Sequence, residues 1–303
     1  MWRANGWHVD ICATEAPEHA IELARDAAAA GADLVMAAGG DGTLGEVANG
    51  LAETDTILAP LPVGTANSFA RELGMPMPGR FEKHKLLKSA EALLNGRVRD
   101  MDLGYTVDGN DNDRYWLLWA GAGADGYFVE QVEPRPTWSK KLGKLGYVIQ
   151  GAGIASKFPY LHATVEVDGC IYEGQFLLTV ISICRYYVGG EVLLSPEARL
   201  DDGVFEIWMF EGGNLIDVFE HLIKARFQMH LKSSKATLVN GRNVTIRTDP
   251  VMACQTDGEL AGYTPLTVQI KPRAIRILTP NTTPPDLFLA EGTPLRELFL
   301  MTD

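Results

Sequence analysis

The sequence has no run of 18 or more apolar residues, so we expect no membrane-spanning helix. Its first residues, MWRANGWHVDICATE, lack the apolar core of a secretory signal peptide. None of the six histidines falls in an HExxH pattern. The four cysteines form no CxxC pair, which gives no support to a zinc ribbon and favours free thiols in a reducing compartment; they are Cys12, Cys170, Cys184 and Cys254. These absences predict a cytoplasmic protein, and they leave open a peripheral contact with a membrane.

Basic residues are also few. The 303 residues include 27 Lys and Arg against 39 Asp and Glu, a net charge of −12. Nucleic-acid phosphates require a basic surface, so we expect no nucleic-acid partner, and an anionic bilayer would require a local basic patch. The fractions of hydrophobic residues (46%) and charged residues (22%) are typical of a globular protein, and the length suits two domains or one large one.

The first hundred residues alternate between helical and strand patterns. They predict helix, strand, helix, strand and helix in that order, at residues 20–30, 33–38, 44–51, 56–59 and 67–73. Strand–loop–helix twice in succession indicates parallel strands with right-handed crossovers. We therefore predict an α/β domain over residues 1–100.

Strand patterns dominate beyond residue 100. Asp168-Gly169 between alternating residues predicts a two-residue hairpin. Further strands are predicted at residues 176–183, 204–210, 244–247 and 266–270. We therefore predict a β-rich, sandwich-like domain over residues 101–280, and a tail over 281–303 that lies extended on the surface. The exposed strand edges of such a domain are compatible with a homodimer.

The sharpest local motif is Gly39-Gly40-Asp41-Gly42-Thr43, between a predicted strand and a predicted helix. Glycines let a ligand approach the backbone, and a helix N-terminus offers N–H groups to phosphate. A carboxylate beside phosphates needs a cation between them, so Asp41 favours a magnesium-bound nucleotide. The alternative is a tight turn in which Asp41 caps the helix.

A second glycine-containing loop, residues 62–71, follows the next strand and includes Gly64, Thr65 and Asn67. The carboxyl ends of neighbouring parallel strands share one edge of a sheet, so the two loops would face one cleft. An ordinary helix cap at Thr65 or Asn67 is the alternative. As a pair, the loops favour a binding site.

Three later motifs are less specific. Asp257-Gly258-Glu259 supplies two carboxylates for proton transfer, and its alternative is a plain Asp-Gly turn. Asp201-Asp202-Gly203 suits a hard cation, or it forms a solvated acidic turn. The spacing GxGxxG at residues 121–126 would indicate a dinucleotide site, but prolines at 134 and 136 stand where a long helix should follow. Glycines near a packed core explain that spacing equally well.

Together these motifs resemble the bacterial diacylglycerol kinases and YegS-like lipid kinases, which are akin to sphingosine and ceramide kinases. The resemblance is carried by GGDGT at 39–43, GTANSFAREL at 64–73, SPEARLDDG at 195–203 and TDGE at 256–259. GGDGT alone is shared with NAD kinases and phosphofructokinase-like folds. GTAN followed by LDDG and DGE is specific to the lipid kinases.

The resemblance implies transfer of the γ-phosphoryl group of ATP to a lipid hydroxyl, with Mg²⁺ as cofactor and diacylglycerol as the expected acceptor. It implies an active site between an N-terminal nucleotide domain and a β-rich domain that holds the lipid. It also implies that Asp257 and Glu259 form the catalytic pair, and that Mg²⁺ is held by the side chain of Asp202 and the backbone oxygens of Arg199 and Val204. The implied ATP contacts are Thr14, Gly39, Gly40, Asp41, Gly42, Thr43, Leu44, Gly45, Gly64, Thr65 and Asn67.

The sequence departs from the family pattern in three places. The family begins with a further strand and an Asn-Pro loop, whereas Met1 lies only 38 residues before Gly39. Gly45 and Ser68 stand where the family commonly has Asn and Asp. Residues 183–185 (Ile-Cys-Arg) replace an Asn-containing stretch. A non-catalytic nucleotide-binding regulator of the same fold, or an enzyme like the NAD kinases, therefore remains an alternative.

Two basic segments are candidates for membrane contact. Residues 221–235 contain four cations and no acidic residue, together with apolar side chains; the cations are Lys224, Arg226, Lys232 and Lys235. The alternative, a solvated basic face on a packed helix, is slightly favoured. A second group comprises Lys140, Lys141 and Lys144 with Trp138 and Tyr147.

Overall fold

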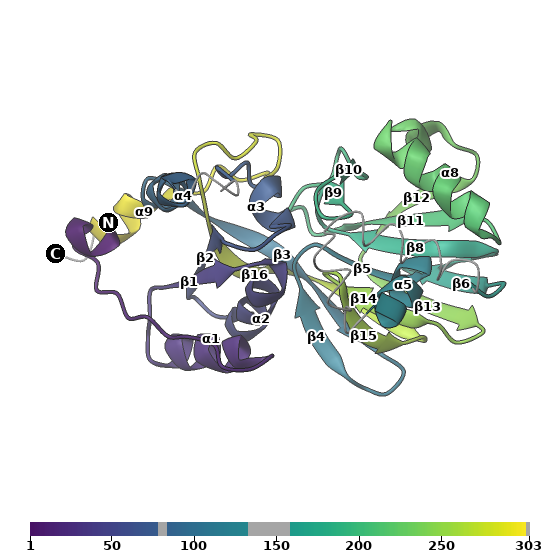
Figure 1. Ribbon diagram of the computed structural model, residues 1–303, viewed down its shortest axis with the longest axis horizontal. Helices are drawn as coiled ribbons and strands as arrows, with labels where there is room; N and C mark the ends of the chain where they lie inside the picture. The colour runs from purple at the N-terminus through teal and green to yellow at the C-terminus, as the bar shows by residue number, and fades with distance from the viewer. Residues whose placement is uncertain (78–83, 133–157, 301–303) are drawn as a thin grey trace.

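The computed structural model describes residues 1–77, 84–132 and 158–300, which form two lobes joined at a narrow waist (Figure 1). The second basic group, Lys140, Lys141 and Lys144, lies outside the described residues. Within those residues, no helix combines the length and the apolar character that crossing a bilayer requires.

The N-terminal lobe is an α/β layer structure, as predicted. Its elements are η1 (Trp2–Asn5), α1 (His19–Ala29), β1 (Leu34–Gly39), α2 (Asp41–Leu51), β2 (Ile57–Pro62), α3 (Ser68–Glu72) and α4 (His84–Leu94). β1 and β2 are parallel, in register from Leu34–Ile57 to Gly39–Pro62. The apolar residues of α2 recur at helical spacing, and Leu44, Val47 and Leu51 are buried. This confirms the strand–helix–strand unit.

The C-terminal lobe is β-rich. It comprises β4 (Asp113–Trp116), β5 (Trp119–Gly123), α5 (Ala124–Val132), β6 (His162–Val167), β7 (Cys170–Gly174), β8 (Phe176–Ser182), β9 (Tyr186–Tyr187), β10 (Val192–Leu193), β11 (Phe205–Glu211), α8 (Leu215–Arg226), η2 (Met229–Lys232), β12 (Ala236–Gly241), β13 (Asn243–Asp249), β14 (Ala253–Thr256) and β15 (Glu259–Tyr263). Six of these strands form an antiparallel sheet in the order β12-β11-β8-β5-β14-β15.

The predicted hairpin joins β6 to β7. Asp168 and Gly169 both have positive φ, 46° and 86°. Two such residues in succession make the type I′ turn, whose twist matches that of antiparallel strands. The hairpin prediction is therefore confirmed.

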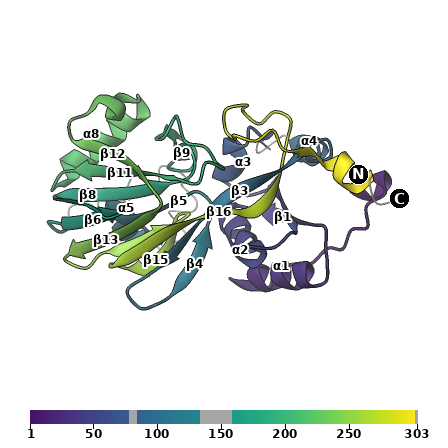
Figure 2. The same cartoon turned by 180° about the vertical axis from the view of Figure 1, so that it is seen from behind.

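Two long strands, β3 (Arg97–Val107) and β16 (Leu266–Thr279), run through both lobes (Figures 1 and 2). They pair antiparallel from Thr267–Val107 to Thr279–Arg97. The far end of β16 also pairs parallel with β2, at Arg276–Ile57. One ladder therefore belongs to the sheets of both lobes and fixes one lobe relative to the other.

β16 is longer than the strand predicted over residues 266–270. The β3–β16 register shifts between Lys271 and Ile275, and Arg273 has a φ of 54°. Proline cannot donate to a ladder, so Pro272 is tolerated because it lies in this bulge. A proline that usually ends a strand here only bends it.

The C-terminal residues differ from the predicted extended surface tail. Leu287 and Leu295 are buried, and the Thr283 hydroxyl donates to the Leu73 carbonyl at 3.0 Å. β17 (Thr293–Pro294) pairs with β3 and is followed by α9 (Leu295–Leu300). Buried apolar side chains thus tie this segment to the N-terminal lobe.

A buried ion pair joins α3 to the C-terminal lobe. Arg185 Nε donates to Glu72 Oε1 at 2.9 Å, and the Tyr186 N–H donates to Glu72 Oε2 at 3.1 Å. Burial raises the pKa of Glu72, while its bonds to Arg185 lower it. Arg185, one of the residues that departs from the family pattern, is thus part of the contact between the lobes.

We expect Glu72→Gln to lower the free energy of unfolding by about 3 kcal/mol, because it removes the buried carboxylate and leaves the Arg185 guanidinium with only the exposed Asp286, 3.5 Å from its Nη1. The matched control is Glu166→Gln, in a solvent-exposed pair with Arg247 at 3.7 Å, where we expect a change below about 0.5 kcal/mol. Urea unfolding measures both. Equal losses in the two variants would contradict a role for the buried pair.

Candidate functional site

The two glycine-containing loops touch at the carboxyl edge of β1 and β2. The Val63 and Gly64 N–H groups donate to the Gly39 carbonyl at 3.1 and 3.2 Å. A Cβ atom on Gly64 would lie only 2.4 Å from the Cα of Gly40. The backbones are therefore packed so closely that position 64 admits no side chain.

Asp41 joins the loops in a way that the sequence did not indicate. Its Oδ2 accepts the Ser68 N–H at 2.9 Å and its Oδ1 accepts the Phe69 N–H at 3.2 Å. Asp41 therefore caps α3, not the helix that it begins, and both of its oxygens are engaged. This differs from the predicted alternative in which Asp41 caps its own helix, whose N-cap is Gly40.

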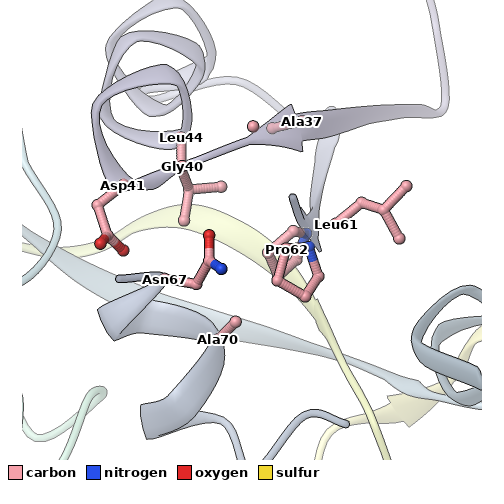
Figure 3. A pocket seen from close by; sticks show the side chains of 10 residues that line it. Ala37, Gly40, Asp41, Leu44, Leu61, Pro62, Asn67 and Ala70 are labelled. Carbon is pink, nitrogen blue, oxygen red and sulfur yellow. The ribbon is translucent and has the colours of Figure 1, made fainter. Parts of the chain in front are cut away.

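Asn67 closes the second loop on itself. Its Nδ2 donates to the Gly64 carbonyl at 2.7 Å, while its Oδ1 accepts the Gly64 N–H at 3.0 Å. Figure 3 shows Asp41 and Asn67 between the start of α2 and the second loop. The cavity beneath them measures about 10 Å³, room for about one water molecule. It is far too small for a nucleotide.

The turn between β14 and β15 places two carboxylates against the first turns of α2. Asp257 Oδ2 lies 3.7 Å from the position that a Cβ of Gly45 would occupy. Glu259 Oε1 lies 2.7 Å from the corresponding position at Gly42. Motifs more than 200 residues apart in the sequence therefore meet, one from each lobe. A Cβ on Gly45 would be in ordinary van der Waals contact with Asp257.

Asp257 lies in a tight turn, and its carboxylate is held by backbone N–H groups. Asp257 and Gly258 have φ values of 52° and 87°, as in the hairpin turn at Asp168. The carboxylate accepts three N–H groups: Leu117 to Oδ2 at 2.8 Å, and Leu118 and Trp119 to Oδ1 at 2.8 and 3.2 Å. Burial raises the pKa of Asp257 to about 6, against the lowering effect of these bonds. The turn and the catalytic interpretation are thus compatible.

Glu259 has a different environment. Its Oε2 lies 3.2 Å from Arg114 Nη2, and its side chain is 42% exposed. Arg114 comes from β4, which the sequence analysis did not single out. The two carboxylates therefore differ in kind, since one is enclosed by backbone amides and the other is paired with a cation near solvent.

A polar network behind the turn was missed by the sequence analysis. Gln255 Oε1 accepts the Gly258 N–H at 2.9 Å, and Gln255 Nε2 donates to Asp125 Oδ2 at 2.8 Å. The Tyr187 hydroxyl donates to the same Asp125 oxygen at 3.0 Å. Burial raises the pKa of Asp125. The network holds the Asp257 turn in place. The only feature of the sequence that could have indicated a role for Gln255 is its position two residues before Asp257.

The glycines at residues 121–126 serve this packing. A Cβ on Gly121 would lie 2.2 Å from Asp125 Oδ2, and a Cβ on Gly126 would lie 2.0 Å from the Ala253 carbonyl. Glycine at these positions lets α5 approach β5 and β14. The geometry supports the packing explanation of GxGxxG over the dinucleotide one.

The predicted magnesium loop lies beside the bulge of β16. Asp202 Oδ1 accepts the Val204 N–H at 3.2 Å. Asp102 accepts the N–H groups of Gly203 at 2.6 Å and Arg273 at 2.8 Å. Burial and neighbouring carboxylates raise the pKa of both Asp102 and Asp202. In the described ranges, no three or more His, Cys, Asp or Glu side chains gather in a metal-binding group. The crowding of negative charge suits a cation, but the ligands would include backbone oxygens.

Of the remaining predicted ATP contacts, most lie at the start of α2. Thr43 packs against Gly39 so closely that a Cβ added to Gly39 would lie 2.4 Å from the Cβ of Thr43. Leu44 is buried and Thr65 is exposed. Thr14 is exposed on the stretch between η1 and α1. The structure thus brings together residues 39–45 and 64–67 with the Asp257 turn.

Comparison with known proteins decides the family. Residues 1–106 match the diacylglycerol kinase catalytic domain, and residues 120–279 match the YegS C-terminal NAD kinase beta sandwich-like domain. A diacylglycerol kinase of Bacillus subtilis is 31% identical over 263 residues, which cover 86% of this chain and 82% of the relative. The chain belongs to the diacylglycerol kinase family. Another member, from Staphylococcus epidermidis, is 29% identical over 279 residues, covering 91% and 83% of the two chains.

Solved structures agree with the fold of this kinase. The crystal structure of a diacylglycerol kinase from Bacillus anthracis str. Sterne superposes with a TM-score of 0.62 at 22% identity, covering 89% of this chain and 85% of that one. A second structure from the same organism gives a TM-score of 0.68 at 24% identity, covering 89% and 86%. The α/β lobe followed by a β-rich lobe is therefore the fold of the family.

We expect Gly64→Ala to destabilise the kinase by about 1–3 kcal/mol, because the new methyl group would overlap the Gly40 backbone. Gly40→Ala is the matched control. Its Cβ would lie 3.5 Å from the Gly64 Cα, an ordinary contact, and we expect a loss below about 1 kcal/mol. Urea unfolding compares the two. A loss at position 40 as large as that at position 64 would contradict the close packing of the loops.

Proposed function

We propose that this kinase transfers the γ-phosphoryl group of Mg²⁺-bound ATP to the hydroxyl of a lipid alcohol, with diacylglycerol as the acceptor and phosphatidic acid as the product. The observation that carries the proposal is the contact of the Asp257 turn with α2 at Gly45, one turn from the glycine motif. The curated relatives at 31% and 29% identity, which are named diacylglycerol kinase, support the choice of acceptor.

The phosphates of ATP would lie over the start of α2. The N–H groups at a helix N-terminus bind phosphate, and glycine, which has no Cβ, lets a phosphate chain come close to the backbone. We assign this binding to residues 39–45 with Gly64, Thr65 and Asn67, and to Thr14 at the edge of the site. Mg²⁺ bound to the phosphates would offset the negative charge of the nearby carboxylates.

Asp257 would act as the general base. A lipid hydroxyl has a pKa far above 7, so a positioned carboxylate must accept its proton while its oxygen attacks the γ-phosphorus. The bond from that phosphorus to the β–γ bridging oxygen breaks, and ADP leaves. A pKa of about 6 makes Asp257 a stronger base than an ordinary Asp, yet it remains mostly ionised at neutral pH. Glu259, paired with Arg114, would orient the reacting groups.

A screen with radiolabelled ATP against a panel of lipid alcohols tests this assignment. We expect labelled phosphatidic acid from diacylglycerol, and Asp257→Asn should lower kcat by at least about 100-fold because no group accepts the proton. Glu173→Gln, on the exposed strand β7, is the matched carboxylate control and should keep full activity.

The pH profile provides a second readout. Because the Asp257 carboxylate must be ionised, the activity of the unaltered enzyme should rise with pH and reach half of its plateau value at about pH 6. Absence of labelled product with every alcohol would sink the proposed activity. Full activity of Asp257→Asn would sink the assignment of the base.

We further propose that a structural Mg²⁺ is held by the Asp202 side chain with the backbone oxygens of Arg199 and Val204. The support is electrostatic: Asp102, Asp201 and Asp202 lie near enough for Asp201 and Asp202 to raise the pKa of Asp102. A divalent cation would relieve this repulsion. A cation there would hold the loop that Asp102 of β3 ties to the bulge of β16.

Thermal unfolding tests the Asp202 site without relying on activity. Millimolar Mg²⁺ should raise the Tm of the unaltered protein by about 2–4 °C, and Asp202→Asn should abolish this rise. Asp111→Asn, in an exposed turn, is the control and should keep it. An equal rise in all three proteins would contradict the assignment.

A further inference from the structure

Helix α8 and the turn η2 that follows it expose an unusual number of large apolar side chains. Seven of them are between 42% and 77% exposed: Ile216, Phe219, Leu222, Ile223, Phe227, Met229 and Leu231. We call these seven residues the α8 patch. Scattered apolar residues on a surface are ordinary, but a contiguous group marks an interaction site.

The α8 patch faces outward on a fixed support. On the inner face, His221 Nε2 lies 2.7 Å from the Glu211 carbonyl oxygen, and its ring contacts Phe210 with centroids 5.0 Å apart. His230 Nε2 lies 2.8 Å from the Leu194 carbonyl oxygen, and its ring contacts Trp208 at 4.9 Å. The helix therefore already packs one side on the described residues of its own lobe, and the patch lies on its other side.

The arrangement of the molecule leaves this surface accessible. Figures 1 and 2 both show α8 at the outer end of the C-terminal lobe, away from the N-terminal lobe, with no described element beyond it. The helix is packed on one side and exposes Arg226 and Lys232 on the other, as the solvated basic face favoured by the sequence requires, but large apolar side chains share that exposed face. The solvated face is mostly apolar.

The charged side chains beside the α8 patch indicate what kind of partner it binds. Lys224 pairs with Glu220 at 2.6 Å, and Lys235 pairs with Asp217 and Glu220 at 3.2 and 3.0 Å. Arg226 and Lys232 are exposed and have no carboxylate within 4 Å among the described residues. Two uncompensated cations beside the patch, in a chain of net charge −12, favour an anionic partner.

We propose that the α8 patch docks on the surface of an anionic lipid bilayer, with its apolar side chains at the acyl boundary and Arg226 and Lys232 among the headgroups. Long basic side chains commonly flank the apolar face of interfacial helices in this way. The proposal rests on the proposed function, because an acceptor with two acyl chains resides in a bilayer. It assigns to a segment outside the proposed catalytic site the role of holding the enzyme at its substrate.

Co-sedimentation with vesicles tests the docking directly. The full chain should bind phosphatidylcholine vesicles that contain phosphatidylglycerol, and the double variant Ile223→Asp/Phe227→Asp should bind at least about tenfold more weakly. Both positions are exposed, so the variant should fold normally. Ile171→Asp, a 63% exposed residue on β7, is the matched control and should bind as the unaltered protein does. Arg226→Gln/Lys232→Gln should weaken binding to the anionic vesicles only.

Activity on two forms of the substrate separates docking from catalysis. The Ile223→Asp/Phe227→Asp variant should keep its turnover on a short-chain diacylglycerol dissolved as a monomer, and lose at least about tenfold on diacylglycerol in anionic vesicles. If the unaltered chain phosphorylates neither form, the proposed function fails, while co-sedimentation still decides the docking.

Two results would overturn the docking. One is equal sedimentation of the unaltered chain and the Ile223→Asp/Phe227→Asp variant, including no sedimentation of either. The other is a light-scattering mass that falls from dimer to monomer in this variant while its vesicle binding is unchanged, because the α8 patch would then be covered by a second copy of the chain.

Discussion

The ladder between β3 and β16 is the constraint on which the rest of the structure depends. Both strands enter both lobes, and their register runs from Thr267–Val107 to Thr279–Arg97 across one bulge. β16 pairs with β2 at one end and with β13 at the other, so the glycine loops and the Asp257 turn are attached to the same strands. If the pairing of β3 with β16 slipped by one residue, the side chains of the shifted strand would point to the opposite face of the sheet. Such a slip would also separate the two halves of the site.

Acidic side chains organise this protein mainly through backbone amides. Asp41 caps α3, Asp102 holds the loop at Gly203, and Asp257 accepts three N–H groups from residues 117–119. Asp201 similarly accepts the N–H groups of Leu289 and Ala290. A carboxylate can satisfy two or more buried N–H groups that have no partner in a helix or sheet. The excess of acidic residues therefore has a structural use within the chain, apart from any cation.

Local patterns predicted much of the fold, whereas contacts across the chain escaped prediction. Helical spacing at Leu44, Val47 and Leu51 and the Asp168-Gly169 turn are encoded within a few neighbours, so β1, α2 and the β6–β7 hairpin followed directly. The alternation at residues 266–270 indicated only the first part of β16, because the bulge that carries the strand past Pro272 depends on the partner strand.

The same limit applies to the candidate site. The motifs indicated which residues meet, and the structure brings the Asp257 turn against α2. The partners of Asp41 lie 27 and 28 residues away, and Gln255 reaches Asp125 across 130 residues, so no local pattern encodes either contact.

The contact between Gly40 and Gly64 has a consequence of its own. The two loops pack against each other and Asp41 bonds one to the other, so their conformation is fixed in the absence of a ligand. A ligand that contacted either loop would therefore cost the loops little conformational entropy on binding.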